Sequence, residues 1–480
     1  MAQRFWITLV ASLLVLGLVL AMVASRHSRP PSPAAPANGT PGIGDPYLPD
    51  AGGGGYDVQN YDVQLSAGAP GQELRGTTTI TAVATQNLDS LHLDLFPTAT
   101  RVRVNGSEAA LEQNGPDLTV VAPRADPRSA AIPNGSAFTL AVDYEGLPER
   151  APVGDPPAYY RAGDEFVIAG EPEAATLWYP ANDHPRDAAT MQFTISVPKG
   201  VEAICAGRLL TEGADPSDSS RDEWVWQVDA PTVTYATFLA IGQYRLERGV
   251  ADGRPYVNAV SERLSTDEQR RALRWLGRTP ASVQRLEEYL GPYPFSGTGG
   301  LVSAVDFYWG GLEAAMRPVY NQNVVGADVF LNHELGHMWL GDTVTLQDWN
   351  DIFDNESLTT YAEWLVDADP AEQFRDGYRD NATNAEFWAP ALSDPGLGHL
   401  FDRVYDRGPL VVHALRNRMG DAAFFALLRA WAQQHGAHSL EQFRTMADDA
   451  TAEDLTGFFS EWLDQTDRPE ATADNGVVAR

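Results

Sequence analysis

Two histidines four residues apart, His333 and His337, constrain the fold more than any other feature of the chain. Residues at this spacing lie on one face of a helix, about 6 Å apart along its axis, so both imidazoles can hold one metal ion. An apolar run at residues 324–331 leads into the pair and predicts that this helix is mostly buried. Because unpaired imidazoles are costly in such a place, we favour metal ligation over a satisfied pair of core histidines.

Two carboxylates complete the predicted metal site. Glu356 follows His337 by nineteen residues and lies in a stretch, residues 355–364, that is expected to form a second helix. It would be the third ligand, which leaves a fourth position open, as in catalytic zinc sites. Glu334 directly follows the first histidine and is better placed as a general base than as a ligand. Two imidazoles and one carboxylate suit one Zn²⁺ per chain.

The segments that carry these residues resemble those of a known family, the gluzincin aminopeptidases, which include aminopeptidase N and leukotriene hydrolase. Residues 333–344 (HELGHMWLGDTV) are similar to the family's metal-binding helix, and residues 348–363 (DWNDIFDNESLTTYAE) to the segment with the third ligand. Ser357 replaces the glycine that usually follows this ligand. Residues 404–408 (VYDRG) resemble the Y-x-K-G motif, which implies that the Tyr405 hydroxyl steadies the tetrahedral intermediate.

The same resemblance implies a set of substrate-binding residues. Residues 309–314 (WGGLEA) are similar to the family's G-x-M-E-N strand, whose glutamate captures the free amino group of the substrate. Glu313 matches that glutamate, and the strand also contains the candidate substrate-binding glycines Gly310 and Gly311. A second carboxylate is expected upstream to help hold the amino group. Glu171 is the favoured residue for this role, and Glu173 is the alternative.

The resemblance implies a zinc aminopeptidase that removes single residues from peptides with free amino termini. Zinc-activated water would attack the first peptide carbonyl, while Glu334 takes its proton and later gives it to the leaving amine. Two alternatives stay open. One is another zinc hydrolase, an endopeptidase or an epoxide hydrolase, because Ala314 replaces the family's asparagine. The other is a non-catalytic surface-binding protein, against which the retained base Glu334 argues.

The charge and the apolar content of the chain limit the kinds of partner that it can bind. The formal net charge of −31 would repel phosphate backbones, so we expect no nucleic-acid partner. Residues 5–24 form an apolar run that is long enough to span a bilayer. We therefore expect residues 1–24 to be a transmembrane anchor, or else a signal segment. The protein would be single-pass in the cell membrane with its catalytic part extracellular, or secreted after cleavage.

The residue pattern predicts an α+β multidomain fold. Residues 25–55 are rich in Pro and Gly and are expected to form a flexible linker. Residues 56–250 contain short alternating runs between turn residues and predict an all-β domain, saddle-like by resemblance. Residues 251–465 change to a helical period and predict a thermolysin-like catalytic domain. Residues 466–480 are expected to be a disordered tail, as in a short form that lacks the family's C-terminal helical domain.

Overall fold

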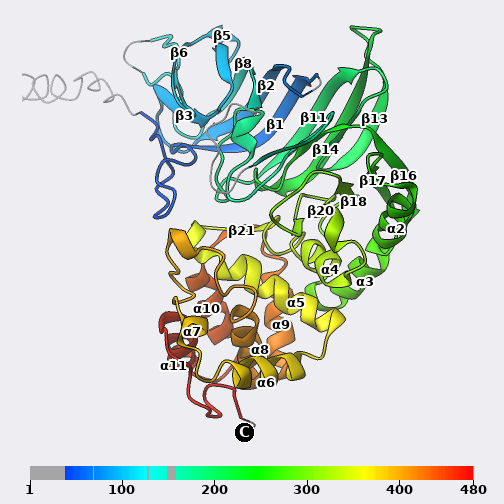
Figure 1. The fold of residues 1–480 in the computed structure, drawn as a ribbon. Coiled ribbons are helices and arrows are strands. Elements are labelled where there is room, and N and C mark those ends of the chain that lie inside the picture. Colours follow the sequence, from blue (N-terminus) through cyan, green and yellow to red (C-terminus); the bar gives the residue numbers. More distant parts are fainter. Residues whose placement is uncertain (1–37, 69, 127–128, 149–157, 479–480) are drawn as a thin grey trace, which may run out of the picture.

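The computed structural model describes residues 38–68, 70–126, 129–148 and 158–478. A region rich in β-sheet is followed along the chain by a mainly helical region, which confirms the α+β class predicted from the sequence (Figure 1). The predicted anchor or signal segment, residues 1–24, lies outside the described residues. Among the helices that the structure does describe, none has the length and apolar character needed to cross a membrane.

An eight-stranded sheet forms the largest part of the first region. In spatial order its strands are β13 (Arg208–Ala214), β14 (Arg221–Thr232), β11 (Ala189–Pro198), β1 (Tyr56–Ser66), β2 (Leu74–Ala84), β8 (Ala137–Gly146), β4 (Thr98–Val104) and β5 (Ser107–Glu108). Strand β1 alternates between buried and exposed side chains, as the sequence predicted. A bulge between Val58 and Asn60 inserts one residue, and therefore Val58 and Tyr61 both face the core although they are three residues apart.

Two smaller sheets complete this region. One has the order β12 (Glu202–Cys205), β15 (Leu239–Gly242), β10 (Glu165–Ile168) and β9 (Tyr159–Ala162). The other has the order β3 (Ser90–Asp94), β7 (Asp117–Val121) and β6 (Ala110–Asn114). Strand β10 matters most for the site, because the loop that follows it contains Glu171.

A five-stranded sheet leads into the helical region. Its order is β16 (Tyr244–Ala251), β17 (Arg254–Ser261), β18 (Thr298–Ser303), β20 (Val319–Asn321) and β19 (Gly311–Leu312). Strand β16 pairs with β17 from Tyr244 to Ala251. The domain boundary predicted between residues 250 and 251 is therefore wrong, because it cuts a hairpin whose two strands belong to this one sheet.

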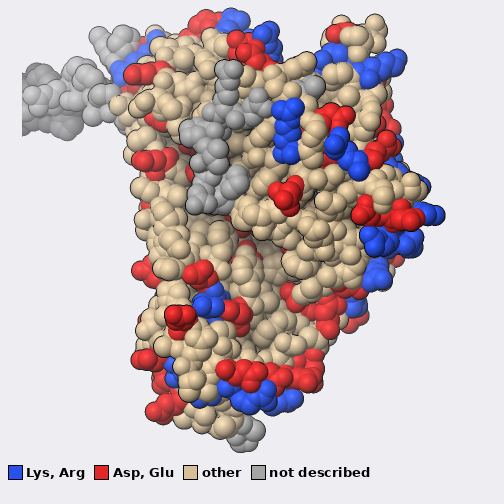
Figure 2. All heavy atoms as spheres, in the orientation of Figure 1, with Lys and Arg blue, Asp and Glu red and all other residues tan. Residues whose placement is uncertain are grey.

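The α-helices of the described residues come after strand β17 along the chain. They are α2 (Thr266–Leu276), α3 (Thr279–Leu290), α4 (Asp328–Gly336), α5 (Leu358–Asp367), α6 (Pro370–Asp380), α7 (Ala385–Trp388), α8 (Gly408–Met419), α9 (Asp421–Trp431), α10 (Leu440–Asp449) and α11 (Thr456–Phe459). Helix α2 opens with a capping box, in which the side chains of Ser265 and Glu268 each accept a hydrogen bond from the other residue's backbone amide. Two short strands, β21 (Val344–Leu346) and β22 (Gly436–His438), pair in parallel beside the helices. Acidic side chains are prominent on the helical half of the face in Figure 2.

The segment expected to be a flexible linker is packed over its described part, residues 38–55, so that expectation is wrong there. Asp45 is buried and its carboxylate lies 3.0 Å from His184 Nε2 and accepts a hydrogen bond of 2.7 Å from the Trp349 amide. Tyr47 donates a hydrogen bond to Asp394 in the helical region. The Pro and Gly content of a segment indicates how flexible it is by itself, but it does not exclude contacts with distant parts of the chain.

The tail expected to be disordered, residues 466–480, is also packed where the structure describes it. Asn475 is buried, and its carbonyl accepts a hydrogen bond of 3.1 Å from the Trp462 indole. The Pro469 carbonyl accepts another, of 2.6 Å, from the Tyr378 hydroxyl. These two aromatic donors need acceptors inside the helical core, and the tail supplies them.

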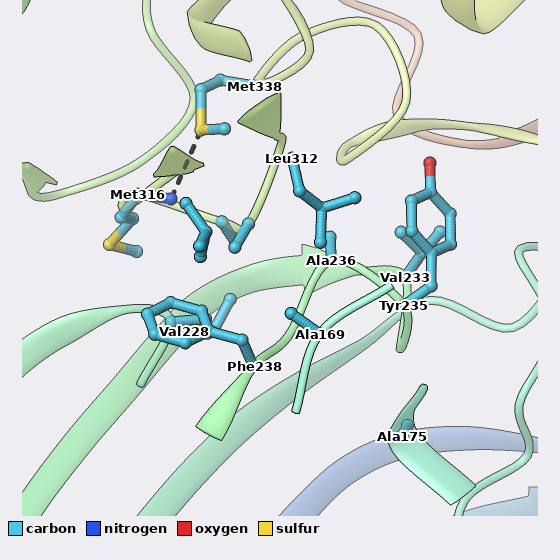
Figure 3. Close-up of a cluster of buried hydrophobic side chains, with 14 of the residues drawn as sticks. Ala169, Ala175, Val228, Val233, Tyr235, Ala236, Phe238, Leu312, Met316 and Met338 are labelled. Atoms are coloured by element: carbon cyan, nitrogen blue, oxygen red, sulfur yellow. Dashed lines mark hydrogen bonds between the residues drawn. The ribbon is translucent and has the colours of Figure 1, made fainter. Parts of the chain in front are cut away.

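An apolar cluster joins the β-rich region to the strand and helix that carry the site (Figure 3). Leu312 from β19 and Met338, just after α4, meet side chains from the β-rich region there. The amide of Met316 lies 3.3 Å from the Met338 sulfur. Because protein interiors are close-packed, this cluster holds strand β19 in a fixed position relative to helix α4.

Candidate active site

The two histidines stand at the end of helix α4. His333 lies in its last turn, and His337 is the residue at which the helix ends. The third predicted ligand, Glu356, lies in a short π-helical segment, Phe353–Ser357, that continues directly into α5. Helices α4 and α5 pack against each other, and the helix predicted over residues 355–364 is therefore confirmed, with a π-helical first turn. Such π-helical turns are frequent at functional sites.

The three predicted ligands form a compact triangle. The Nε2 atoms of His333 and His337 lie 3.1 Å apart, and each lies 3.3 Å from Oε2 of Glu356. Ligand atoms about 2.0–2.1 Å from a tetrahedral zinc ion lie about 3.3 Å from one another. The distances and the donor set of two imidazoles and one carboxylate therefore fit zinc.

The other nitrogens of the two imidazoles have partners that orient the rings. Nδ1 of His337 lies 2.9 Å from the Leu340 carbonyl oxygen and 2.8 Å from Oδ1 of Asn355. Nδ1 of His333 lies 3.4 Å from a Glu363 carboxylate oxygen. When Nε2 of each ring binds a metal ion, the remaining ring proton stands on Nδ1 and faces these acceptors, as in metal-binding histidines.

The charges around the triangle favour a cation. Burial lowers the pKa of His337, but Glu356 and Glu313 outweigh it and raise that pKa to about 9. The pKa of His333 is also raised, because Glu356 and Glu363 outweigh the burial of its ring. Burial opposes ionisation of Glu356, yet the two imidazoles hold its pKa below the usual range. A metal ion at the centre would replace these ring protons as the partner of the carboxylate.

Glu334 lies against the glycine pair that the sequence analysis singled out. A Cβ atom on Gly311 would stand 2.2 Å from Oε1 of Glu334, and one on Gly310 would stand 2.3 Å from the Phe330 ring. The two glycines therefore let strand β19 approach helix α4 closely. Glu334 is 4% exposed, and burial raises the pKa of its carboxyl group to about 8. A group of this kind can both accept and return a proton near neutral pH.

Two further carboxylates lie beside the third predicted ligand, Glu356. Oxygens of Glu171, Glu313 and Glu356 all lie within 4.8 Å of one another. Oε1 of Glu313 is buried and has no hydrogen-bond partner among the described residues. Burial, and then the neighbouring Glu313 and Glu356, raises the pKa of Glu171 well above its usual value. Because buried like charges are costly, this group of carboxylates is suited to a cationic partner such as an ammonium group.

One cleft contains every residue of the predicted site. It has a volume of about 570 Å³ and is lined by Glu171, Gly310, Gly311, Glu313, His333, Glu334, His337, Glu356 and Tyr405. Glu173, the alternative to Glu171, is exposed and does not line it. Tyr405 is 44% exposed, and the centroid of its ring lies 5.8 Å from that of the His333 ring. The cleft wall also has apolar residues that sequence reasoning missed, namely Tyr308, Trp309, Val329, Phe330, Trp364 and Phe401.

The backbone on both sides of Tyr405 is held by buried side chains. The Ser357 hydroxyl donates a hydrogen bond of 2.9 Å to the Val404 carbonyl. The Arg407 guanidinium donates to the carbonyls of Trp388, Pro390, Trp462 and Gln465. Sequence reasoning had noted Ser357 only as a departure from the family's glycine, and it had assigned no role to Asn355. The one available signal was that both residues flank Glu356.

Comparison with known proteins agrees with this geometry. Residues 321–462 match the Peptidase family M1 domain. The aminopeptidase N of Streptomyces lividans is 25% identical over 468 residues, which cover 88% of this chain and 52% of that protein. The leukotriene A-4 hydrolase of Xenopus laevis is 24% identical over 311 residues, which cover 60% of this chain and 49% of that protein. The chain thus spans about half the length of these relatives.

Solved structures extend the match over both regions. The M1 zinc metallopeptidase from Deinococcus radiodurans is 26% identical with a TM-score of 0.80, and the match covers 89% of this chain and 98% of that one. A mutant of that enzyme bound to a Tyr-Ser-Ala substrate is 26% identical with a TM-score of 0.76, over 88% of this chain and 97% of that one. The ordered motifs, the triangle of predicted ligands and these matches all support the gluzincin aminopeptidase family, peptidase family M1, as the family that this chain resembles.

Proposed function

We propose that this chain is a zinc aminopeptidase that removes one residue at a time from the free amino terminus of peptides. The observation that carries the proposal is the position of the two extra carboxylates. Glu171 and Glu313 lie within 4.8 Å of the ligand Glu356, so an ammonium group bound to them is next to the metal site. Only a single α-carbon separates a terminal amine from the first peptide carbonyl, which places that carbonyl beside the metal ligands.

The residues of the cleft divide the chemistry among them. One zinc ion per chain, held by His333, His337 and Glu356, would supply a Lewis acid and a water of lowered pKa. Glu334 accepts the proton of the attacking water and transfers it to the leaving amine. The Tyr405 hydroxyl donates a hydrogen bond to the oxygen of the attacked carbonyl.

Relatives support the same activity. The similar protein from Streptomyces lividans is an aminopeptidase N, and the similar Deinococcus metallopeptidase has been captured with a tripeptide. The fold would then correspond to a saddle-like β-domain and a thermolysin-like catalytic domain.

We also propose that residues 1–24 anchor the chain in the cell membrane with the cleft outside the cell. Fractionation of the full chain tests this localisation.

The activity is tested with a peptide mixture, half of it acetylated at the amino terminus, beside a Glu334→Ala control. We expect stepwise loss of terminal residues from the free peptides only, and no reaction in the control. Internal cuts in both halves would contradict the amine anchor and favour an endopeptidase. Turnover of epoxides without peptide cleavage would favour the other zinc hydrolase, and bound zinc without any turnover would favour a binding protein.

A further inference from the structure

Asn355 connects two parts of the cleft that come from different regions of the chain. Its side chain is fully buried in the π-helical segment directly before the ligand Glu356. Oδ1 lies 2.8 Å from Nδ1 of the ligand His337. On the other side of the amide, Nδ2 donates to Oε1 of Glu171 at 3.4 Å and to the Tyr235 hydroxyl at 3.2 Å. One side chain thus contacts both a metal ligand and an amine anchor.

The orientation of this amide follows from the metal site. Because Nε2 of His337 faces Glu356 across the ligand triangle, its Nδ1 carries the proton and must find acceptors. Oδ1 of Asn355 therefore accepts from Nδ1 beside the Leu340 carbonyl, and both hydrogens of Nδ2 point the other way, to Glu171 and Tyr235. An amide flipped by half a turn would set a donor against the donor of His337.

Packing leaves the amide little freedom. Gly341 has a φ of +121°, and a Cβ atom there would stand 2.2 Å from Oδ1 of Asn355. On the opposite side, the Tyr235 ring lies 5.5 Å from that of Trp349, centroid to centroid. Tyr235 comes from the loop between β14 and β15 and belongs to the apolar cluster in Figure 3. The amide is held between the helical region and the β-rich region.

Glu171 needs such a contact because its own segment does not carry the metal ligands. It follows strand β10 of the β-rich region, whereas the ligands stand on α4 and on the π-helical segment before α5. A small shift between the two regions would change the distance from the amine anchor to the metal. The hydrogen bond from Asn355 opposes that shift at the site itself.

We propose that Asn355 is a positioning residue that holds Glu171 at a fixed place relative to His337, and so sets the distance between the terminal amine and the attacked bond. This inference rests on the proposed aminopeptidase function. It assigns to Asn355 a part in choosing free amino termini, separate from its support of the metal ligand. The two roles use opposite ends of the amide, which allows one substitution to separate them.

The Asn355→Asp variant makes that separation. Its carboxylate still accepts from His337 Nδ1, so we expect the zinc dissociation constant to stay within a few-fold of the wild type. It has no hydrogen to donate to Glu171, and the two carboxylates repel. We expect the ratio of kcat/KM for free over acetylated peptides to fall about tenfold or more, as for loss of a hydrogen bond to a charged group. Binding of free L-tryptophan to the zinc-loaded protein, measured by calorimetry, should weaken in parallel.

Controls separate this role from general effects. Asn323→Asp adds the same charge at an exposed position and should change neither the ratio nor the binding of L-tryptophan. In a Glu171→Gln background, Asn355→Asp should have little further effect on the ratio, since the proposed effect passes through Glu171. If the Asp variant does not fold, Asn355→Ser assayed at saturating zinc replaces it, because its shorter side chain cannot span the two partners.

The outcomes distinguish this inference from the function on which it rests. Wild-type protein that cuts no free peptide would overturn the aminopeptidase proposal itself. Wild-type activity with an unchanged ratio in Asn355→Asp would overturn only the role of Asn355 in positioning Glu171. A weaker zinc affinity in Asn355→Asp with an unchanged ratio at saturating zinc would reduce Asn355 to a support of His337.

Discussion

The hydroxyl of Ser357 is predicted to act on the reaction through Tyr405. Ser357 directly follows the proposed ligand Glu356, is fully buried, and donates a hydrogen bond of 2.9 Å to the carbonyl of Val404. The next residue along the chain is Tyr405, whose hydroxyl we expect to donate to the attacked carbonyl. Substitution Ser357→Ala removes the donor and leaves a buried carbonyl unpaired, which costs about 1–3 kcal/mol.

The size of the effect on rate follows from the same contact. If about 1–2 kcal/mol of that cost appears as misplacement of Tyr405, kcat/KM falls by about 5- to 30-fold. The loss is bounded by that of Tyr405→Phe, for which removal of an oxyanion donor predicts a fall of about a hundred- to a thousandfold. The assay measures kcat/KM on an unblocked peptide for both single variants and for the double variant.

The double variant tests the reasoning. If Ser357 acts through Tyr405, adding Ser357→Ala to Tyr405→Phe should cost little more than Tyr405→Phe alone. Full multiplication of the two losses would refute the coupling. Thr232→Val is the matched control, since it removes a buried hydroxyl that donates at 3.0 Å to the Ala230 carbonyl in the β-rich region. It should lower the free energy of unfolding without changing kcat/KM.

Three further predictions concern the base, the metal and pH. Glu334→Gln should lower kcat/KM by about a hundred- to ten-thousandfold while zinc content, measured by atomic absorption, stays at that of the wild type. Removing zinc with a chelator should lower Tm reversibly, because a ligand at a thousand times its Kd stabilises the folded state by about 4 kcal/mol. An unchanged Tm in calorimetry would contradict the proposed zinc site. Burial lowers the pKa of His413 from 6.5 to about 4. The free energy of unfolding is therefore highest above pH 6.5, where His413 is neutral in both states, and it falls by about 3 kcal/mol as the pH drops toward 4. Denaturant unfolding of wild type and His413→Asn should therefore diverge in pH dependence across that range, and parallel curves would contradict the assignment.

Much of the proposed metal site was predictable because its arrangement depends on local geometry. The spacing of His333 and His337 places them on one helical face in any fold that keeps the helix. The stretch with Glu356 was predicted as a second helix from its own residues, and the structure adds only that it opens with a π-helical turn. Glu313 and Tyr405 were assigned by the order of short motifs, and both line the cleft.

Contacts between distant segments were not predictable. The packing of residues 38–55 depends on acceptors and donors such as His184 and Asp394, which lie far away in the sequence. The same holds for the tail, whose carbonyls accept from Tyr378 and Trp462. Local composition measures the tendency of a segment to order by itself, and these segments are ordered by partners elsewhere.

The sequence by itself determined the residues proposed for the chemistry, namely the proposed ligand set and the proposed base, and the change from a β-rich to a helical pattern. These depend on residue type and on separations of a few residues, over which backbone geometry is regular. Only the tertiary structure decided that Glu171 and not Glu173 enters the cleft, and that Asn355 joins it to His337. Those contacts depend on how the β-rich region packs against the helices, where a displacement of a few ångströms makes or breaks a hydrogen bond.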